Sequence, residues 1–254
     1  MTVAEQIARA KADYDEVYEA GYAKGQAEGG DTTAAYDEGF EAGKKAEYDA
    51  FWDAHQVNGT RKNYANTFAC WALENIHPKY DMKPTTTYMM FRATGVSAGG
   101  TLDLVERLNE CGVILDTSEC TTFQYMFYES SITHVGVIDT RGAASINDVF
   151  DYSRIQTIEK LILRDDGSQT FSGSFRSCSI VNIVIEGVIG KNGLNLQWST
   201  SLSKASITSI INALSTTTEG LTVTLSKTAK EAAFTADEWS ALIATRNNWT
   251  ISLV

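Results

Sequence analysis

Four successive segments between Phe123 and Ile210 repeat one pattern of apolar residues. In each segment an apolar residue precedes a large aromatic by four positions, an Ile follows, and a second aliphatic residue comes three positions after that Ile. The segments are Phe123, Phe127, Ile132 and Val135; Ile146, Phe150, Ile155 and Ile158; Phe171, Phe175, Ile180 and Ile183; and Leu194, Trp198, Ile207 and Ile210. The large aromatics are 23, 25 and 23 positions apart, and a near-constant period of roughly 20 to 50 residues is the signature of stacked repeats. The pattern therefore predicts a solenoid over residues 111–201, in which each repeat packs on its neighbours.

The repeated apolar residues are the predicted core, and the polar turns between them are the predicted binding surface. We expect short parallel strands near residues 135–138, 160–163 and 182–185. The core positions are Phe127, Phe150, Phe175, Trp198, Ile132, Ile155, Ile180 and Ile207. The candidate binding residues are Arg141, Arg164, Asp165, Asp166, Lys191 and Asn192.

Residues 1–56 carry a narrow apolar stripe with intervals of three and four residues, which is typical of a helix that packs on another helix. The segment Tyr14–Gly21 (YDEVYEAG) recurs at Tyr36–Gly43 (YDEGFEAG), so an internal duplication is the simplest interpretation. One continuous rod and two helices separated near Gly25–Thr33 both fit the pattern. In either case we expect a helical, coiled-coil-like oligomerisation segment.

Two further parts flank the predicted repeats. Residues 57–110 contain the aromatics Tyr64, Phe68 and Trp71, which we interpret as an N-terminal cap rather than as a platform for carbohydrate. A connector with both prolines follows, and then a strand at Tyr88–Phe91 and a helical turn at Leu102–Leu108.

Residues 202–254 predict an α/β C-terminal cap continuous with the repeat sheet. A helix is expected at 203–214, a strand at 221–225 and a strand at 249–254. Thr235 and Glu238 have the spacing of a capping box and predict the start of a helix that extends to Arg246.

The segment Phe175–Ile183 (FRSCSIVNI) resembles the A-F-x-x-C-x-x-L-x-x-I core of the BspA-type leucine-rich repeat. The other repeats have Ser130, Ser153 and Ser201 at the cysteine position, and the chain lacks the I-P strand motif of that family. Residues 48–52, 64–71, 78–81 and 202–254 are similar to leucine-rich-repeat proteins of gut tailed phages and prophages from Firmicutes. The resemblance implies a short, irregular leucine-rich-repeat (BspA-like) α/β solenoid in a protein that is part of a virion or binds a host surface.

Composition and motifs favour binding over catalysis. The net charge of −11 argues against nucleic-acid binding. The four cysteines form no C-x-x-C pair, and the three histidines have no zinc-site spacing, so we expect no metal, no cofactor and no catalytic residues. Carboxylate pairs that could hydrolyse glycosides stay open, because their separation is a property of the tertiary structure.

The N-terminus lacks the apolar stretch of a signal peptide, and the sequence contains no apolar run of membrane-spanning length. We expect synthesis in the cytoplasm without a signal peptide and no membrane insertion. The location would then be the virion for a phage protein, or otherwise the bacterial cytoplasm or cell surface.

The leading hypothesis is a non-enzymatic adhesion protein, a component of a phage tail or fibre. In this hypothesis residues 1–56 form a homo-oligomer, a trimer as in many phage fibres, and the solenoid contacts other virion proteins or a host protein or glycan. One alternative is a bacterial leucine-rich-repeat protein that binds a protein or a glycan. The other is a polysaccharide-degrading enzyme built on a solenoid.

Overall fold

The computed structural model describes residues 63–73, 76–96 and 99–254. Apart from Pro78–Tyr80, which belong to a second unit whose other residues lie outside these ranges, the described residues form one compact unit. This unit is an α/β fold with two parallel sheets and few helices. The predicted oligomerisation segment, residues 1–56, and the first part of the predicted N-terminal cap lie outside the described residues.

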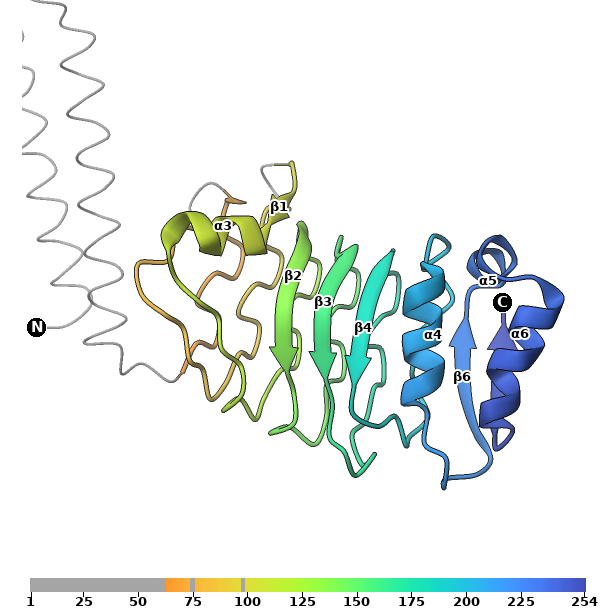
Figure 1. Cartoon of the computed structure of the whole chain (residues 1–254). Helices are drawn as coiled ribbons and strands as arrows, with labels where there is room; N and C mark the ends of the chain where they lie inside the picture. Colours follow the sequence, from red (N-terminus) through yellow and green to blue (C-terminus); the bar gives the residue numbers. More distant parts are fainter. Residues whose placement is uncertain (1–62, 74–75, 97–98) are drawn as a thin grey trace, which may run out of the picture. The chain divides into compact units, whose positions relative to one another are not determined.

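The first sheet has four parallel strands in the order β1-β2-β3-β4 (Figure 1). The strands are β1 (Leu102–Asp103), β2 (Ile132–Asp139), β3 (Thr157–Ile162) and β4 (Asn182–Glu186). Val135 of β2 pairs in register with Ile158 of β3, which pairs with Ile183 of β4. All three side chains are buried, because the second aliphatic residue of each repeat occupies the same position on the inner face of its strand. The three predicted strands are confirmed.

The second sheet has three parallel strands in the order β5-β6-β7. These are β5 (Asn195–Leu196), β6 (Leu221–Leu225) and β7 (Trp249–Leu253). The helices of the unit are α3 (Leu104–Cys111), α4 (Lys204–Ala213), α5 (Lys227–Ala233) and α6 (Ala236–Ile243), and a short 3-10 helix, η3 (Ala244–Arg246), extends α6. The capping box of Thr235 and Glu238 is present at the start of α6, as predicted. The sequence patterns did not identify β1, β5 and α5.

The expectation that residues 202–254 continue the repeat sheet is wrong, because helix α4 lies where the next strand would be (Figure 1). Two serines on one face of α4 supply the hydrogen bonds of the missing strand. The N–H groups of Ile183 and Ile185 donate to Oγ of Ser206 and Ser209 at 2.9 and 2.8 Å. These bonds satisfy the edge of β4, which would otherwise be open to another strand, and the first sheet ends there.

Behind the first sheet, the chain forms a ladder of paired turns, which we call turn pairs. Each has eight residues, a left-handed backbone conformation at its third and seventh positions, and a phenylalanine at its fifth. Within the described residues there are five: 64–71, 87–94, 123–130, 146–153 and 171–178. Backbone hydrogen bonds join neighbouring turn pairs; for example, the N–H groups of Asp148, Phe150 and Tyr152 donate to carbonyls of residues 172, 174 and 176 at 2.9 to 3.0 Å.

The five phenylalanines form one stacked column. Neighbouring ring centroids are 5.0, 5.3, 5.6 and 5.3 Å apart along Phe68, Phe91, Phe127, Phe150 and Phe175, and each ring is buried. The predicted strand at Tyr88–Phe91 is therefore wrong, because these residues lie in a turn pair. Phe68, a residue of the predicted N-terminal cap, likewise belongs to the column.

Seven of the eight predicted core residues are buried, but Trp198 is 55% exposed. The sequence pattern placed Trp198 one repeat after Phe175. However, the chain leaves the ladder before this position, because β5 pairs with β6. Leu194 and Leu196 are buried in this segment, and the indole ring has no place in the phenylalanine column.

We predict that Phe150→Ala lowers the free energy of unfolding by about 3 to 5 kcal/mol, because it leaves a cavity in the middle of the phenylalanine column. Urea denaturation measures this loss. Trp198→Ala is the matched control and should change stability by less than about 1 kcal/mol, because its ring is half exposed. Equal losses of unfolding free energy in the two variants would contradict the placement of Phe150 inside the column and of Trp198 outside it.

Candidate functional site

A cleft of about 650 Å³ opens where the last turn pair and strand β5 separate. Its lining comes from four parts of the chain: turn pairs 146–153 and 171–178, the segment 192–198 that contains β5, and β6. The lining residues are Asp148, Tyr152, Ser172, Gly173, Phe175, Arg176, Ser177, Asn192, Gly193, Leu194, Asn195, Gln197, Trp198, Thr222 and Thr224. The volume lies within the roughly 300 to 1,000 Å³ of typical small-molecule sites.

The cleft results from the break in the ladder. The N–H of Thr224 donates to the Leu194 carbonyl at 3.2 Å, and the N–H of Thr222 donates to Asn192 Oδ1 at 2.7 Å, so this segment is bonded to β6. Among the described residues, no backbone bond joins it to turn pair 171–178. Gly193 has a φ of 113°, and a Cβ there would lie 3.4 Å from the Ser172 nitrogen, so glycine suits the point of divergence.

One ion pair fixes the ladder side of the cleft. The Asp151 side chain is 0% exposed, whereas that of Arg176 is 55% exposed. Arg176 Nε donates to both carboxylate oxygens of Asp151 at 3.1 and 3.2 Å, and its Nη2 makes a further bond to Oδ2. The guanidinium also lies over the Tyr152 ring at 5.2 Å from its centroid. These hydrogen bonds and the charge of Asp151 raise the pKa of Arg176.

Asp148 is the other carboxylate of the cleft. Burial raises its pKa above the ordinary value and the charge of Asp151 adds to this, while Arg176 and a hydrogen bond from Gln124 act in the opposite direction. The carboxylate lies directly over Gly173, where a Cβ would clash with Oδ1. Asp148 therefore offers a hydrogen-bond acceptor at the wall of the cleft.

A row of tyrosines leads across the turn pairs to the cleft. We call Tyr88, Tyr125, Tyr128 and Tyr152 the tyrosine row. Successive rings meet edge to face with centroids 6.2, 5.4 and 6.0 Å apart. Tyr152 is 48% exposed, and the other three are half-buried. Tyr152 and Trp198 both line the cleft, so the tyrosine row ends at the cleft that also holds the exposed indole.

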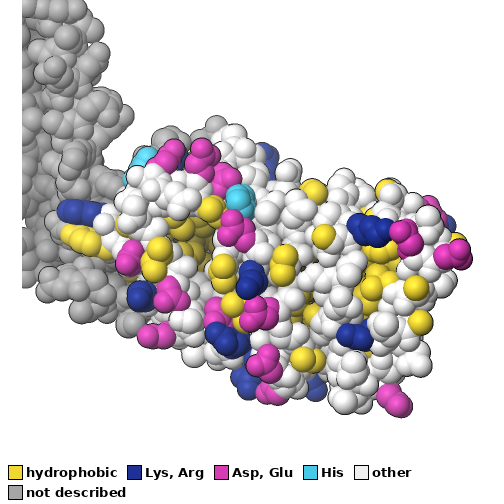
Figure 2. Space-filling view, viewed as in Figure 1, with side chains coloured by type: hydrophobic (Ala, Val, Ile, Leu, Met, Phe, Trp, Pro, Cys, Tyr) yellow, Lys and Arg dark blue, Asp and Glu magenta, His cyan; other side chains and the backbone are white. Residues whose placement is uncertain are grey.

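The strand side has a different surface. In Figure 2, acidic and basic side chains are interspersed over β2, β3 and β4, and apolar side chains are scattered among them. The large exposed apolar side chains on these strands are Val137 and Val184. An aromatic surface is therefore a property of the turn side.

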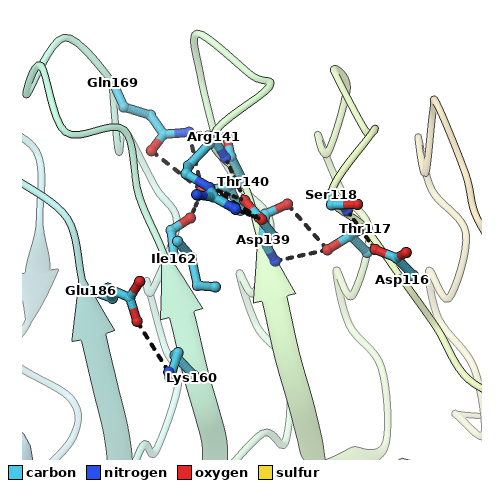
Figure 3. A network of polar contacts seen from close by, with 10 residues as sticks. All are labelled: Asp116, Thr117, Ser118, Asp139, Thr140, Arg141, Lys160, Ile162, Gln169 and Glu186. Atoms are coloured by element: carbon cyan, nitrogen blue, oxygen red, sulfur yellow. Dashed lines mark hydrogen bonds and ion pairs between the residues drawn. The ribbon is translucent and has the colours of Figure 1, made fainter.

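Most of the sequence-predicted binding residues do not line the cleft and follow the ends of β2 and β3 in the chain. Figure 3 shows Arg141 among them. Arg141 Nε donates to Asp139 Oδ1 at 3.0 Å. Burial would raise the pKa of Asp139, but the hydrogen bonds from Arg141 outweigh this and lower it. Arg164 pairs with Asp166 at 2.9 Å. Asp165 and Lys191 are exposed, and Asn192 is the one candidate that lines the cleft.

Around these turns, buried polar side chains join successive repeats. The N–H of Asp139 donates to Thr117 Oγ1 at 2.8 Å. Gln169 Nε2 donates to the Thr140 carbonyl at 2.8 Å, and the Thr140 hydroxyl donates to the Ile162 carbonyl at 2.7 Å. This network, drawn in Figure 3, stabilises the turns. The neighbouring cations Arg141 and Lys160 are paired with Asp139 and Glu186.

Sequence patterns missed Asp148, Tyr152, Arg176 and the exposure of Trp198. One signal was available: Ile207 follows Trp198 by nine positions, whereas the Ile of each earlier repeat follows its aromatic by five. This longer interval marks the point where the repeat geometry changes.

The described residues contain one histidine between carboxylates. His134 Nδ1 lies 2.8 Å from Asp103 Oδ2, and its Nε2 lies 3.4 Å from Glu159 Oε1. Among these residues no hydroxyl or thiol hydrogen-bonds to the imidazole, so it has no adjacent nucleophile. In the same part of the chain, no group of three or more His, Cys, Asp or Glu side chains could hold a metal ion.

Comparisons with protein-family models, with curated proteins and with solved structures gave no significant match. Within the described ranges, no helix has both the length and the apolar character needed to cross a membrane.

We predict that Arg176→Ala destabilises the protein by about 1 to 3 kcal/mol, because it leaves the buried Asp151 carboxylate without its charged partner. The lower half of that range is expected, since water can reach the site once the half-exposed guanidinium is gone. Arg164→Ala is the matched control: it breaks the exposed pair with Asp166, and its effect on urea denaturation should be too small to resolve. A larger loss for Arg164→Ala than for Arg176→Ala would contradict this view of the cleft.

Proposed function

We propose that residues 63–254 form a short solenoid of leucine-rich-repeat type that binds a ligand on another surface. Two features support the solenoid: the strands are parallel with Val135, Ile158 and Ile183 paired in one row, and the turn pairs stack behind them with a common phenylalanine column. Each of the last four turn pairs is then followed by one strand of the first sheet, from β1 to β4. Helix α4 and the second sheet end the array, as a terminal cap must.

The observation that carries the binding function is the aromatic turn side, made of the tyrosine row and Trp198 beside the cleft. Soluble proteins expose single apolar residues at random, but an aligned group of large rings that ends at a cleft is typical of a binding surface. The rings are held in place by stacked turns, so a ligand would meet an ordered surface. Little conformational entropy would then be lost on binding.

The proposal also includes a homotrimer that forms through residues 1–56. A homotrimer formed through that segment would present three copies of the binding surface, and linked copies bind a multivalent surface more tightly than one copy does. This arrangement suits a phage tail or fibre component that contacts a host surface. The resemblance to leucine-rich-repeat proteins of gut phages is consistent with that role.

A polysaccharide-degrading enzyme is the second candidate, because Asp148 is a cleft carboxyl with a raised pKa, as a general acid requires. Glycoside hydrolysis needs a second carboxylate on the other side of the scissile bond. The nearby Asp151 is buried and paired with Arg176, which makes it unsuitable as a base or nucleophile. The binding function is therefore the better supported of the two.

The binding function predicts saturable attachment of the fluorescently labelled full chain to isolated cell envelopes of at least one gut Firmicutes species. Tyr152→Ala/Trp198→Ala should reduce attachment by about tenfold or more. Val137→Ala/Val184→Ala, which alters exposed apolar residues on the strand side, should leave attachment unchanged. Attachment that is insensitive to the turn-side variant, or no saturable attachment, would contradict the proposal.

An assay on the same cell envelopes distinguishes a binding protein from an enzyme. Reducing sugar ends released into the supernatant would be measured during the incubation. Steady release by the wild-type chain, lost in Asp148→Asn, would favour the enzyme over the binding protein.

The proposed trimer predicts that sedimentation equilibrium of the full chain gives three times the chain mass of 27.8 kDa. A chain shortened to begin at Asn58 should sediment with the mass of one copy. If the full chain sediments as one copy, residues 1–56 do not form the proposed assembly.

A further inference from the structure

We infer that the cleft beside Trp198 binds a neutral saccharide, with one sugar ring stacked on the exposed indole. This inference deepens the proposed binding function and rests on it, because it assigns a ligand class to the same surface. Three observations support it: the exposed indole of Trp198, the orientation of two amide side chains, and the pairing of the cleft residue Arg176 with a buried carboxylate.

The backbone that carries Trp198 is anchored to the last turn pair. Although the Trp198 ring is 55% exposed, the next residue, Ser199, is buried. The Ser199 hydroxyl donates to the Cys178 carbonyl at 3.1 Å, and its Oγ accepts the N–H of Ile180 at 3.0 Å. These bonds anchor the backbone under the indole to the last turn pair. The exposed indole on this backbone offers a large, flat, apolar face that is suited to stack against the C–H face of a pyranose ring.

Two amide side chains are oriented as donors. Asn192 Oδ1 accepts the N–H of Thr222 at 2.7 Å, and Asn195 Oδ1 accepts the N–H of Gln197 at 3.0 Å. Each bond turns the amide oxygen toward the backbone, so the donor Nδ2 lies at the opposite end of the amide. Neither Nδ2 has a protein acceptor among the described residues, and both side chains line the cleft.

Sugar hydroxyls both donate and accept hydrogen bonds, and the cleft offers partners for both. The Asn192 and Asn195 amides can donate, and the Asp148 carboxylate can accept. The Ser172, Thr222 and Thr224 residues that line the same cleft carry hydroxyl groups that can do either. A mixture of this kind beside one large ring is the arrangement that recognises a polyol with an apolar face.

The charges in the cleft disfavour an anionic ligand. Arg176 is the cation among the lining residues, and its guanidinium is bonded to Asp151 and stacked on Tyr152. An anionic sugar or a phosphate would meet the Asp148 carboxylate without a free cation to offset it. The net charge of −11 acts in the same direction.

The test is isothermal titration of the full chain with four probes. Three are neutral tetrasaccharides, namely cellotetraose, mannotetraose and tetra-N-acetylchitotetraose, and the fourth is the anionic tetragalacturonate. We expect at least one neutral probe to bind at millimolar concentration and the anionic probe to give no heat of binding. A proline-rich decapeptide is added because an extended peptide could also stack on aromatic rings.

Variants then locate the binding site. Trp198→Ala should weaken binding of the neutral saccharide by about tenfold or more, and Trp198→Phe should keep part of the affinity that Trp198→Ala loses. Asn195→Asp keeps the acceptor for the Gln197 N–H and removes the Nδ2 donor, so it should weaken binding with an unchanged thermal melt. Val184→Ala on the strand side is the control and should bind like the wild type.

Three outcomes would overturn the inference: no neutral tetrasaccharide binds, only the anionic probe or the peptide binds, or Trp198→Ala binds a saccharide as well as the wild type does. Failure here is distinct from failure of the proposed function. If envelope attachment needs Trp198 but no neutral saccharide binds, the surface is a binding site for another ligand class and the saccharide inference falls.

Discussion

The stacking of turn pairs is the interaction on which the rest of the structure depends. Each turn pair needs two left-handed residues, which are mostly not glycine and cost roughly 1 to 2 kcal/mol each. Against this, each turn pair buries a phenylalanine worth about 3 to 5 kcal/mol on truncation and bonds to its neighbour through backbone groups worth about 1 kcal/mol each. The balance favours the conformation only when a neighbour is present, so the turn pairs must form together.

The same dependence on neighbours explains why the candidate site lies where it does. A stack needs an end, and here it ends differently on its two sides. On the strand side, Ser206 and Ser209 of α4 satisfy β4. On the turn side, β5 departs to pair with β6, and turn pair 171–178 is left with an open flank. The cleft beside Trp198 is that flank, and its polar lining comes from segments that the departure brings together.

Charged side chains have different roles at the two edges of the repeats. At the ends of β2 and β3, Arg141 and Arg164 are held by carboxylates two residues away, so they stabilise local turns. In the cleft, the ion pair of Arg176 with the buried Asp151 joins two adjacent turn pairs. That pair orients a cation over Tyr152 and offsets its charge with the Asp151 carboxylate, which favours the proposed ligand without charge.

The sequence by itself determined the local elements: the inner strand positions Val135, Ile158 and Ile183, the capping box of Thr235, and strand β6. These depend on periodicity and on hydrogen bonds between near neighbours in the chain. The tertiary structure decided which segments stack. Phe68 and Phe91 join the phenylalanine column although α3 lengthens the interval from Phe91 to Phe127, whereas Trp198, at the expected interval, stays exposed. An apolar pattern shows that a side chain can be buried, but only the path of the chain decides whether another segment arrives to cover it.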